Sequence, residues 1–247
     1  MSFVVVIPAR YDSTRLPGKP LLEIAGKSMI QRAWEGAKQS SADAVIVATD
    51  DRRIYEAARD FGAEAEMTSA DHSSGSDRVQ EVVQNLGLSL DQIVVNVQGD
   101  EPLLPPELIN RVAINLKKKA SAGIATLASA LTNDSDFNNP NVVKIVRDRD
   151  EFALYFSRSP IPQALTPGNN AVGLKHIGIY AYRVAVLNEF VRWPVGDLEK
   201  VERLEQLRAL ENGAQIHVGM VEHELPKGVD TQADLERVRN YFLSVQA

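Results

Sequence analysis

The sequence predicts an α/β fold built on a mostly parallel β-sheet. Three β-branched apolar runs without two-residue alternation indicate strands buried on both faces, namely 4–7, 44–49 and 93–97. Helical patterns separate these runs, and such a β-α-β series predicts parallel strands joined by right-handed crossovers. The runs 142–146 and 153–158 follow each other without a helical pattern between them. We therefore expect a small antiparallel extension beside the parallel sheet.

The composition limits the class of protein. The 247 residues are 44% hydrophobic and 24% charged, which excludes a disordered chain and is compatible with a single domain over residues 1–247. A net charge of -6 argues against general nucleic-acid binding. The absence of cysteine excludes disulfides, thiolate zinc sites and a cysteine nucleophile. No apolar run approaches the ~20 residues of a membrane span and no signal-peptide pattern is present, so we expect a cytoplasmic protein without membrane contact.

Three cations follow the first predicted strand, which ends at Pro8. Arg10, Arg15 and Lys19 lie in a loop that also contains small and hydroxyl residues, among them Thr14. Ligands bind at the carboxyl ends of strands in open α/β sheets, and backbone N–H groups in such loops hold anions. The loop contains neither the P-loop pattern nor the dinucleotide-binding glycine fingerprint. We predict a polyphosphate site here; the alternative is a solvated cationic surface.

Two further segments begin helices directly after strands. Asp50 and Asp51 follow the second buried run, and an aspartate at this place is interpreted as a cap of the next helix, over 54–61, in preference to a metal ligand. Ser74, Gly75 and Arg78 lie where the next helix begins, and a hydroxyl and backbone N–H groups there suit an anion or a nucleobase edge. Taken alone, this segment is more typical of a helix cap.

A second polar turn follows the run 93–97. It presents Gln98, Asp100 and Glu101 at the same predicted edge of the sheet. Mg²⁺ bound with a nucleotide takes one or two protein carboxylates together with phosphate oxygens. Asp100 would meet the phosphates gathered by the first loop, so we favour metal binding over the alternative, a turn cap before Pro102.

The second half of the chain carries weaker signals. Residues 174–182 alternate in the manner of a half-buried strand, which places His176 and Tyr180 on one face. These side chains would suit sugar hydroxyls, although a lone histidine there is more often a packing residue. A helix capped by Asp197 is expected to continue to Leu210, with its polar side chains solvated.

The C-terminal segment combines a turn with a helix cap. Thr231 and Asp234 form a capping box at the start of the last predicted helix. Asp230 falls one residue before this cap, so capping does not fully explain an acidic residue at this position.

Several stretches resemble a known family. Ile-Pro-Ala-Arg at 7–10 and Ser-Thr-Arg-Leu-Pro-Gly-Lys-Pro-Leu at 13–21 are similar to the nucleotide-binding signature of the sugar nucleotidyltransferases, most closely of the 3-deoxy-manno-octulosonate (Kdo) cytidylyltransferase family. Further similar stretches follow in the family's order: Val-Gln-Gly-Asp-Glu-Pro at 97–102, Ser-Arg-x-x-Ile-Pro at 157–162, His-x-Gly-Ile-Tyr at 176–180, Leu-Glu-Gln-Leu-Arg at 204–208 and Val-Asp-Thr at 229–231. This colinearity from Ile7 to Asp234 is more specific than any single motif.

The resemblance implies a three-layer Rossmann-like nucleotidyltransferase fold and a defined reaction. CMP would pass from CTP to the anomeric hydroxyl of an acidic 3-deoxy-2-keto sugar, with release of pyrophosphate, in lipopolysaccharide synthesis. The resemblance also implies Mg²⁺ as cofactor, with Asp100 and Asp230 as ligands, and a homodimer. The catalytic residues would be Arg10, Arg15, Lys19 and Asp100.

The same resemblance assigns two sets of binding residues. The nucleotide would be bound by Pro8, Ala9, Arg10, Thr14, Arg15, Lys19, Ser74, Gly75, Arg78 and Gln98. The sugar would be bound by Arg78, Gln98, Arg158, His176, Tyr180, Glu205 and Gln206.

Two other functions remain as alternatives. One is a pyrophosphorylase that joins a nucleotide to a sugar 1-phosphate, and the other is a catalytically silent nucleotide-binding module. The loop 163–172 is shorter than is typical of the family, which leaves Kdo and its 8-amino analogue as alternative acceptors.

Overall fold

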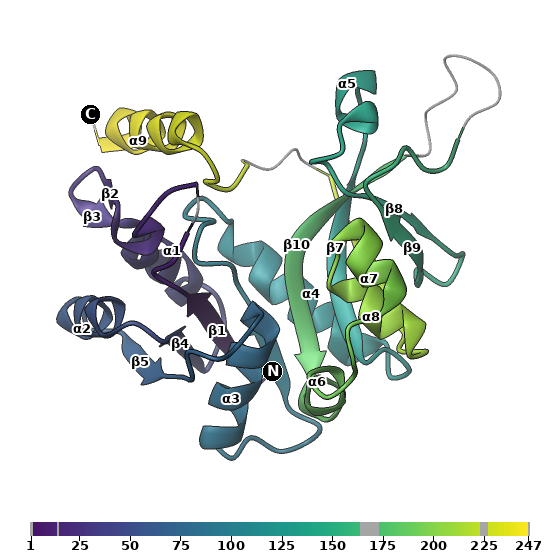
Figure 1. Cartoon of the computed structure of the whole chain (residues 1–247), viewed down its shortest axis with the longest axis horizontal. Coiled ribbons are helices and arrows are strands. Elements are labelled where there is room, and N and C mark those ends of the chain that lie inside the picture. The colour runs from purple at the N-terminus through teal and green to yellow at the C-terminus, as the bar shows by residue number, and fades with distance from the viewer. Residues whose placement is uncertain (1, 14, 164–172, 223–226, 247) are drawn as a thin grey trace. The chain divides into compact units, whose positions relative to one another are not determined.

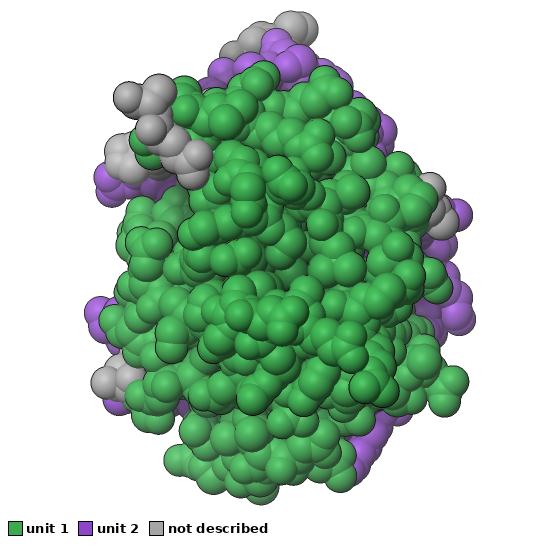
Figure 2. All heavy atoms as spheres, turned by 90° about the vertical axis from the view of Figure 1, so that its left-hand side faces the viewer, with its two compact units in different colours: residues 1–111, 225–247 green, residues 112–224 purple. Residues whose placement is uncertain are grey.

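The structure is a computed structural model that describes residues 2–13, 15–163, 173–222 and 227–246. It divides into two compact units, residues 1–111 with 225–247 and residues 112–224. The two parts of the first unit, far apart in sequence, form one continuous surface, drawn in green in Figure 2. Nothing in this division tests the expectation of one domain over residues 1–247, which stays a prediction.

The first unit contains a parallel sheet in the order β6-β1-β4-β5. Its strands are β1 (Val4–Ala9), β4 (Ala44–Thr49), β5 (Glu64–Met67) and β6 (Ile93–Asn96). Nearly all side chains of β1, β4 and β6 are buried, as expected for strands covered on both faces. The predicted parallel sheet is confirmed.

Helices cover this sheet on both faces. α1 (Met29–Lys38) and α2 (Arg52–Asp60) connect β1 to β4 and β4 to β5, whereas α3 (Gly75–Asn85) returns the chain past β1 to β6 (Figure 1). Right-handed crossovers place α3 on the face opposite α1 and α2, which produces the expected three layers. Because the strand order reverses at β1, the loops after β1 and β6 leave the same edge of the sheet next to each other, where ligands bind in such folds.

The helix starts follow the caps that the sequence indicates. Ser28 accepts a hydrogen bond from the backbone N–H of Gln31 at the start of α1, and Asp51 accepts one from that of Arg53 at the start of α2. Ser74 forms a capping box at the start of α3. The expected aspartate cap is therefore confirmed at Asp51, whereas Asp50 accepts a hydrogen bond from Arg78.

The C-terminal helix α9 (Gln232–Gln246) belongs to the first unit because an apolar cluster holds it there. Val229, Leu235 and Val238 are almost completely buried and pack with Leu16 and Ile24. Ile24 lies in β2 (Glu23–Ile24), which pairs with β3 (Lys27–Ser28) in a short hairpin beside α9 (Figure 1). This packing places Asp230, the residue before the α9 cap, beside the loop after β1.

The second unit contains a mixed sheet in the order β11-β7-β10-β8-β9. β11 runs parallel to β7 and the remaining pairs are antiparallel, which confirms the antiparallel extension. The chain enters this unit within α4 (Pro106–Lys118). The strands are β7 (Ile124–Ala130), β8 (Lys144–Arg147), β9 (Ala153–Ser157), β10 (Leu174–Arg183) and β11 (Ile216–Val221). The helices are α5 (Asp134–Asn138), α6 (Val184–Phe190), α7 (Asp197–Glu202) and α8 (Gln206–Glu211).

An irregularity in β10 leaves its two faces intact. Ile177 pairs with Leu127, whereas Tyr180 pairs with Thr126, so two additional residues of β10 are accommodated between these pairs. A shift of two residues preserves the alternation of side chains, since the period of a strand is two. His176 therefore shares a face with Tyr180, and their ring centroids lie 5.3 Å apart.

The expected single helix from Asp197 to Leu210 is wrong, and so is its expected cap, because the N-cap of α7 is Gly196 and Asp197 is the first residue of the helix. α7 ends at Glu202, Arg203 adopts the left-handed conformation with φ 53° and ψ 46°, and α8 begins at Gln206. Arg158 stabilises this break because its Nε and Nη2 donate to the carbonyl oxygens of Glu202 and Arg203, at 2.7 and 3.4 Å. These carbonyls at the end of α7 thereby gain donors from outside the helix.

We expect Arg203→Val to lower the free energy of unfolding by about 1–2 kcal/mol relative to Arg203→Gly, because a β-branched residue is disfavoured in the left-handed region whereas glycine is not. The two variants remove the same exposed side chain, so the comparison isolates the backbone conformation. Urea denaturation of both variants would measure the difference, and equal midpoints would contradict the conformation at Arg203.

Candidate functional site

The loop after β1 is folded back on an aromatic side chain. Gly18 has a φ of +66°, and a Cβ at this position would lie 3.1 Å from the ring of Tyr11. The Gly18 N–H donates to the Tyr11 carbonyl at 3.2 Å, and the guanidinium of Arg53 lies over the Tyr11 ring, 3.3 Å from its centroid. Sequence reasoning missed this anchoring role of Tyr11, although an aromatic residue beside the loop cations was a usable signal.

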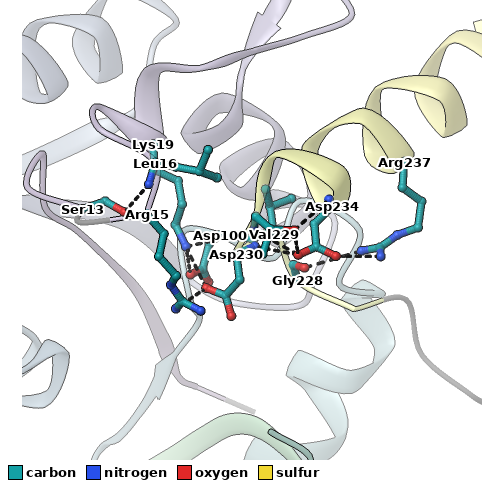
Figure 3. Close-up of polar contacts among 11 residues, drawn as sticks. Ser13, Arg15, Leu16, Lys19, Asp100, Gly228, Val229, Asp230, Asp234 and Arg237 are labelled. Carbon is teal, nitrogen blue, oxygen red and sulfur yellow. Dashed lines mark hydrogen bonds and ion pairs between the residues drawn. The ribbon is translucent and has the colours of Figure 1, made fainter.

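Lys19 joins three segments of the first unit. Its Nζ lies 2.5 Å from Oδ2 of Asp100, 2.8 Å from the carbonyl oxygen of Val229 and 3.3 Å from Oδ1 of Asp230. Arg15 donates to the same Oδ1 of Asp230 at 2.9 Å. Figure 3 shows the Lys19 and Arg15 side chains converging on the two carboxylates. The structure thus brings together four predicted site residues from the loop after β1, the turn after β6 and the segment before α9.

Two backbone features position Asp230. The N–H of Val229 donates to the carbonyl of Asp100 at 2.9 Å, which holds the segment against the turn after β6. The following capping box is present, because Thr231 accepts from the N–H of Asp234 and the Asp234 carboxylate accepts from the N–H of Thr231. The N–H of Asp230 also donates to the Asp234 carboxylate, at 3.3 Å, while its own carboxylate faces Lys19.

The acidic side chains make this edge of the sheet a site for cations. Burial, with the carboxylates of Asp100 and Asp230 adding to it, raises the pKa of Glu101 to about 7. This carboxyl group was not among the predicted site residues, although it neighbours Asp100 in sequence. Among the described residues, no group of three or more metal-ligating side chains is close enough to hold a metal ion.

The donor set nevertheless suits Mg²⁺ bound together with phosphate. Asp100 and Asp230 both approach one cation, the ammonium of Lys19, so both carboxylates already face a common point of positive charge. Two carboxylate ligands completed by phosphate oxygens and water are the usual set for Mg²⁺ in nucleotide complexes. The residues present therefore fit the ion, and the metal assignment stays a prediction.

The predicted nucleotide-binding residues border a single cavity of about 790 Å³, which is in the size range of small-molecule sites. Thr14 lies outside the described residues. The other predicted residues around the cavity are Pro8, Ala9, Arg10, Arg15, Lys19, Ser74, Gly75, Arg78, Gln98, Asp100 and Asp230. Their individual contacts with a nucleotide stay predictions.

The start of α3 closes one side of this cavity. A Cβ on Gly75 would lie 3.3 Å from Cγ of Pro8, so glycine permits a close approach of α3 to the end of β1. Arg78 is buried, with its Nη2 2.9 Å from Oδ2 of Asp50 and its Nη1 donating to the hydroxyl of Thr68. Arg78 therefore helps to shape the wall of the cavity through contacts with its own neighbours.

The other predicted sugar-binding residues lie in the second unit. His176 Nε2 is 2.9 Å from the Thr126 hydroxyl, and Phe156 packs edge-on against its ring at a centroid distance of 5.1 Å. The Tyr180 hydroxyl is buried without a hydrogen-bond partner among the described residues. Such an unsatisfied group is unfavourable in a fold and is typical of functional positions.

The break between α7 and α8 decides the position of two further residues. Glu205 immediately precedes α8 and Gln206, its first residue, is buried. Arg208 on α8 forms a bidentate ion pair with Glu199 on α7, in which Nε and Nη2 each lie 2.7 Å from a carboxylate oxygen. This pair connects α8 to α7. Arg78 and Gln98 belong to the first unit and the other predicted sugar-binding residues to the second, so a common sugar site stays a prediction.

Within the described ranges of the chain, none of the helices combines the length and the apolar character that crossing a bilayer requires.

Comparison with known proteins connects this geometry to a family. A cytidylyltransferase family model matches residues 4–216. The chain is 56% identical to the 3-deoxy-manno-octulosonate cytidylyltransferase of Cellvibrio japonicus over 97% of each chain. It is 53% identical to the protein of the same name from Saccharophagus degradans, over 97% of this chain and 98% of the relative.

Solved structures agree with the sequence relatives. A structure described as CMP:2-keto-3-deoxy-manno-octonic acid synthetase complexed with CTP matches with a TM-score of 0.91 at 43% identity, over 99% of this chain and 100% of the other. A cytidylyltransferase from Leptospira borgpetersenii matches with a TM-score of 0.62 at 16% identity, over 98% and 87% of the two chains, and supports the fold alone. The family model and the full-length relatives show that the chain belongs to the cytidylyltransferases, and among them to the 3-deoxy-manno-octulosonate cytidylyltransferase family.

Proposed function

We propose that this protein transfers CMP from CTP to the anomeric hydroxyl of Kdo and releases pyrophosphate, which activates the sugar for lipopolysaccharide synthesis. The observation that carries the proposal is the cluster of Arg15, Lys19, Asp100 and Asp230 at the carboxyl edge of the sheet. The names of the curated relatives and the CTP complex of the structural relative support the choice of substrates. We further propose a cytoplasmic homodimer.

The reaction requires positioning and charge neutralisation more than covalent chemistry. The sugar hydroxyl loses its proton to water and its oxygen attacks the α-phosphorus of CTP. The bond from that phosphorus to the oxygen that bridges it to the β-phosphate breaks, and pyrophosphate leaves with the electron pair of this bond. Arg10, Arg15 and Lys19 would hold the triphosphate and neutralise that charge. Removal of one such contact should cost about 2–4 kcal/mol of transition-state stabilisation.

Asp100 and Asp230 would hold Mg²⁺ against the phosphates. The bound ion would supply charge neutralisation and a template for in-line attack. In the structure Lys19 Nζ lies between these two carboxylates. Lys19 would therefore exchange a carboxylate for a phosphate oxygen when the nucleotide and the ion bind, and this exchange keeps its charge paired.

His176 is suited to bind a sugar hydroxyl in its neutral form. Burial lowers its pKa to about 3. The Thr126 hydroxyl lies 2.8 Å from the carbonyl oxygen of Ile179, to which it donates its single proton, so it accepts from Nε2–H of His176. This assignment leaves Nδ1 of His176 as a hydrogen-bond acceptor for a hydroxyl.

The two alternative functions are less well supported. A pyrophosphorylase for sugar 1-phosphates would need cations for a second phosphate, whereas the predicted sugar residues of the second unit combine one arginine with His176, Tyr180, Glu205 and Gln206. A catalytically silent module would not need the two candidate metal carboxylates beside the loop cations, and both are present.

Pyrophosphate release in the presence of CTP and Mg²⁺ tests the proposed function. We expect release with Kdo, and a parallel assay with its 8-amino analogue, other 2-keto sugar acids and sugar 1-phosphates measures selectivity. Release with a sugar 1-phosphate alone would support the pyrophosphorylase, and no release with any acceptor would support the silent module.

We expect Asp100→Asn to reduce Mg²⁺-dependent turnover by about 100-fold or more, because it removes a charged metal ligand. It should also abolish the additional increase in melting temperature that Mg²⁺ produces in the presence of CTP. Asp12→Asn is the matched control, since Asp12 borders the same cavity without contacting Lys19 in the described residues. Near-normal turnover of Asp100→Asn would disprove the metal assignment.

The neutral His176 predicts a pH dependence of stability. The unfolded protein takes up a proton at this residue below its ordinary pKa of 6.5, whereas the folded protein does so only near 3. The free energy of unfolding should therefore fall as the pH decreases from 6.5 towards 3, by up to about 1.4 kcal/mol per pH unit from this residue. Urea denaturation at pH 7, 6, 5 and 4 should show a smaller decrease for His176→Gln, and parallel curves would contradict a neutral, buried imidazole.

A further inference from the structure

The second unit buries a lysine among neutral groups. Lys144 on β8 has no exposed surface, and its Nζ donates to the carbonyl oxygens of Asn139, Val142 and Arg158 at 2.9, 2.7 and 2.5 Å. These three bonds use all three N–H groups of the ammonium. Burial lowers the pKa of Lys144, and the Glu202 carboxylate partly offsets this effect.

This arrangement is unfavourable as mere packing. Transfer of a charge out of water is costly, and the cost is usually met by a directly paired opposite charge. Lys144 makes no ion pair within the part of the chain that the structure describes. An apolar side chain would leave the carbonyl oxygens of Asn139, Val142 and Arg158 without this donor, so the role of the ammonium is to hold these three peptides together.

One of those bonds holds the peptide of Arg158, and Glu202 holds the same residue from its other side. The Arg158 N–H donates to Oε2 of Glu202 at 2.9 Å, and the neighbouring Ser157 hydroxyl donates to Oε1 at 2.6 Å. The Arg158 carbonyl accepts from Lys144. Both polar groups of this peptide residue are therefore bound by charged side chains, and such bonds are roughly twice as strong as neutral ones.

The side chain of Arg158 depends on the same groups. Its Nη1 donates to the carbonyl of Pro140 at 2.9 Å, within the turn whose other carbonyls bind Lys144. Its Nε donates to the carbonyl of Glu202 at 2.7 Å. The orientation of the guanidinium is thus determined by the turn at residues 139–142 and by the end of α7.

Charges of both signs act on this region. Lys144 and Arg158 are cations, and the carboxylates of Glu202 and Glu211 act on the same strands. Glu202 also ends α7, only three residues before Glu205, so the same contacts connect Arg158 with the other predicted sugar-binding segment. β8, β9 and α7 lie close together in the second unit (Figure 1).

We propose that Lys144 and Glu202 are positioning residues for the sugar substrate: together they hold the Arg158 peptide, and thereby its guanidinium, in the orientation that binds the carboxylate of the acidic sugar. This inference rests on the proposed function, in which Arg158 contacts that sugar. Neither residue touches the substrate, and both act through Arg158.

The natural absence of cysteine allows a stringent experiment. Lys144→Cys is alkylated in denaturant with bromoethylamine, which forms a thioether analogue of lysine, and is then refolded. The matched control is the same variant treated with methyl methanethiosulfonate, which adds a neutral group. Wild-type protein carried through both procedures controls for refolding, because it has no thiol to modify.

We expect the neutral form to have a KM for Kdo about tenfold or more above the wild type, with a KM for CTP within about twofold, since only the sugar contact is displaced. The aminoethylated form should recover the wild-type KM for Kdo. A purely structural role predicts instead that both KM values and kcat change together, or that the charged and neutral forms behave alike, and either result would overturn the inference.

Glu202→Gln keeps the test decisive if the neutral Lys144 form fails to refold. The carboxylate of Glu202 accepts from both the Ser157 hydroxyl and the Arg158 N–H, whereas the single oxygen of a glutamine amide is a neutral and weaker acceptor. We therefore expect a raised KM for Kdo and an unchanged KM for CTP. An unchanged KM for Kdo in Glu202→Gln overturns the inference.

Arg158→Gln separates this inference from the proposed function. If this variant leaves the KM for Kdo unchanged, the sugar assignment of Arg158 is wrong and the inference falls with it. If Arg158→Gln raises that KM while Lys144 and Glu202 variants do not, the proposed function stands and only the positioning role is disproved. In the Arg158→Gln background, the neutral form of Lys144→Cys should raise the KM for Kdo little further, because the effects of residues that act through each other are not additive.

Discussion

The ammonium of Lys19 is the contact on which the nucleotide pocket depends. It joins the loop after β1 to Asp100 after β6 and to the segment at Val229 and Asp230, more than 200 positions away in the chain. Burial raises the pKa of the neighbouring Glu101, and the carboxylates of Asp100 and Asp230 add to this effect. The apolar cluster around Val229 and Leu235 places the C-terminal segment here, and Lys19 then pairs with the acidic side chains that meet at this edge.

The second unit uses cations for a different purpose. Arg158 and Lys144 donate to backbone carbonyls at the end of α7 and in the turn at residues 139–142. These carbonyls lack partners within regular secondary structure, and charged donors satisfy them strongly. The chain can then interrupt a helix at Arg203 without leaving buried polar groups unpaired, and the interruption determines where Glu205 and Gln206 lie.

These two arrangements, the ion pairs of Lys19 in the first unit and the backbone contacts of Arg158 and Lys144 in the second, correspond to the two halves of the proposed reaction. In the first unit, cations paired with carboxylates can be exchanged for phosphate and a metal ion, because each partner is only partly buried. In the second unit, the buried Lys144 and the neutral His176 cannot exchange partners with solvent in this way, and they hold a fixed surface. In the proposed reaction, exchangeable ion pairs would serve the nucleotide and fixed polar contacts would serve the sugar.

By itself, the sequence determined the parallel sheet, the antiparallel extension, the helix caps after β4 and at Thr231, and the meeting of Lys19 with Asp100. Local propensity, strand burial and the rule that loops meet at the carboxyl edge are enough for these features. Only the tertiary structure decided the break at Arg203, the anchoring of Tyr11 by Arg53 and the environment of Glu101. The reason is that each of these depends on side chains distant in sequence: an apolar stripe such as the one through Leu204 and Leu207 predicts a continuous helix until Arg158 supplies donors for its interrupted end.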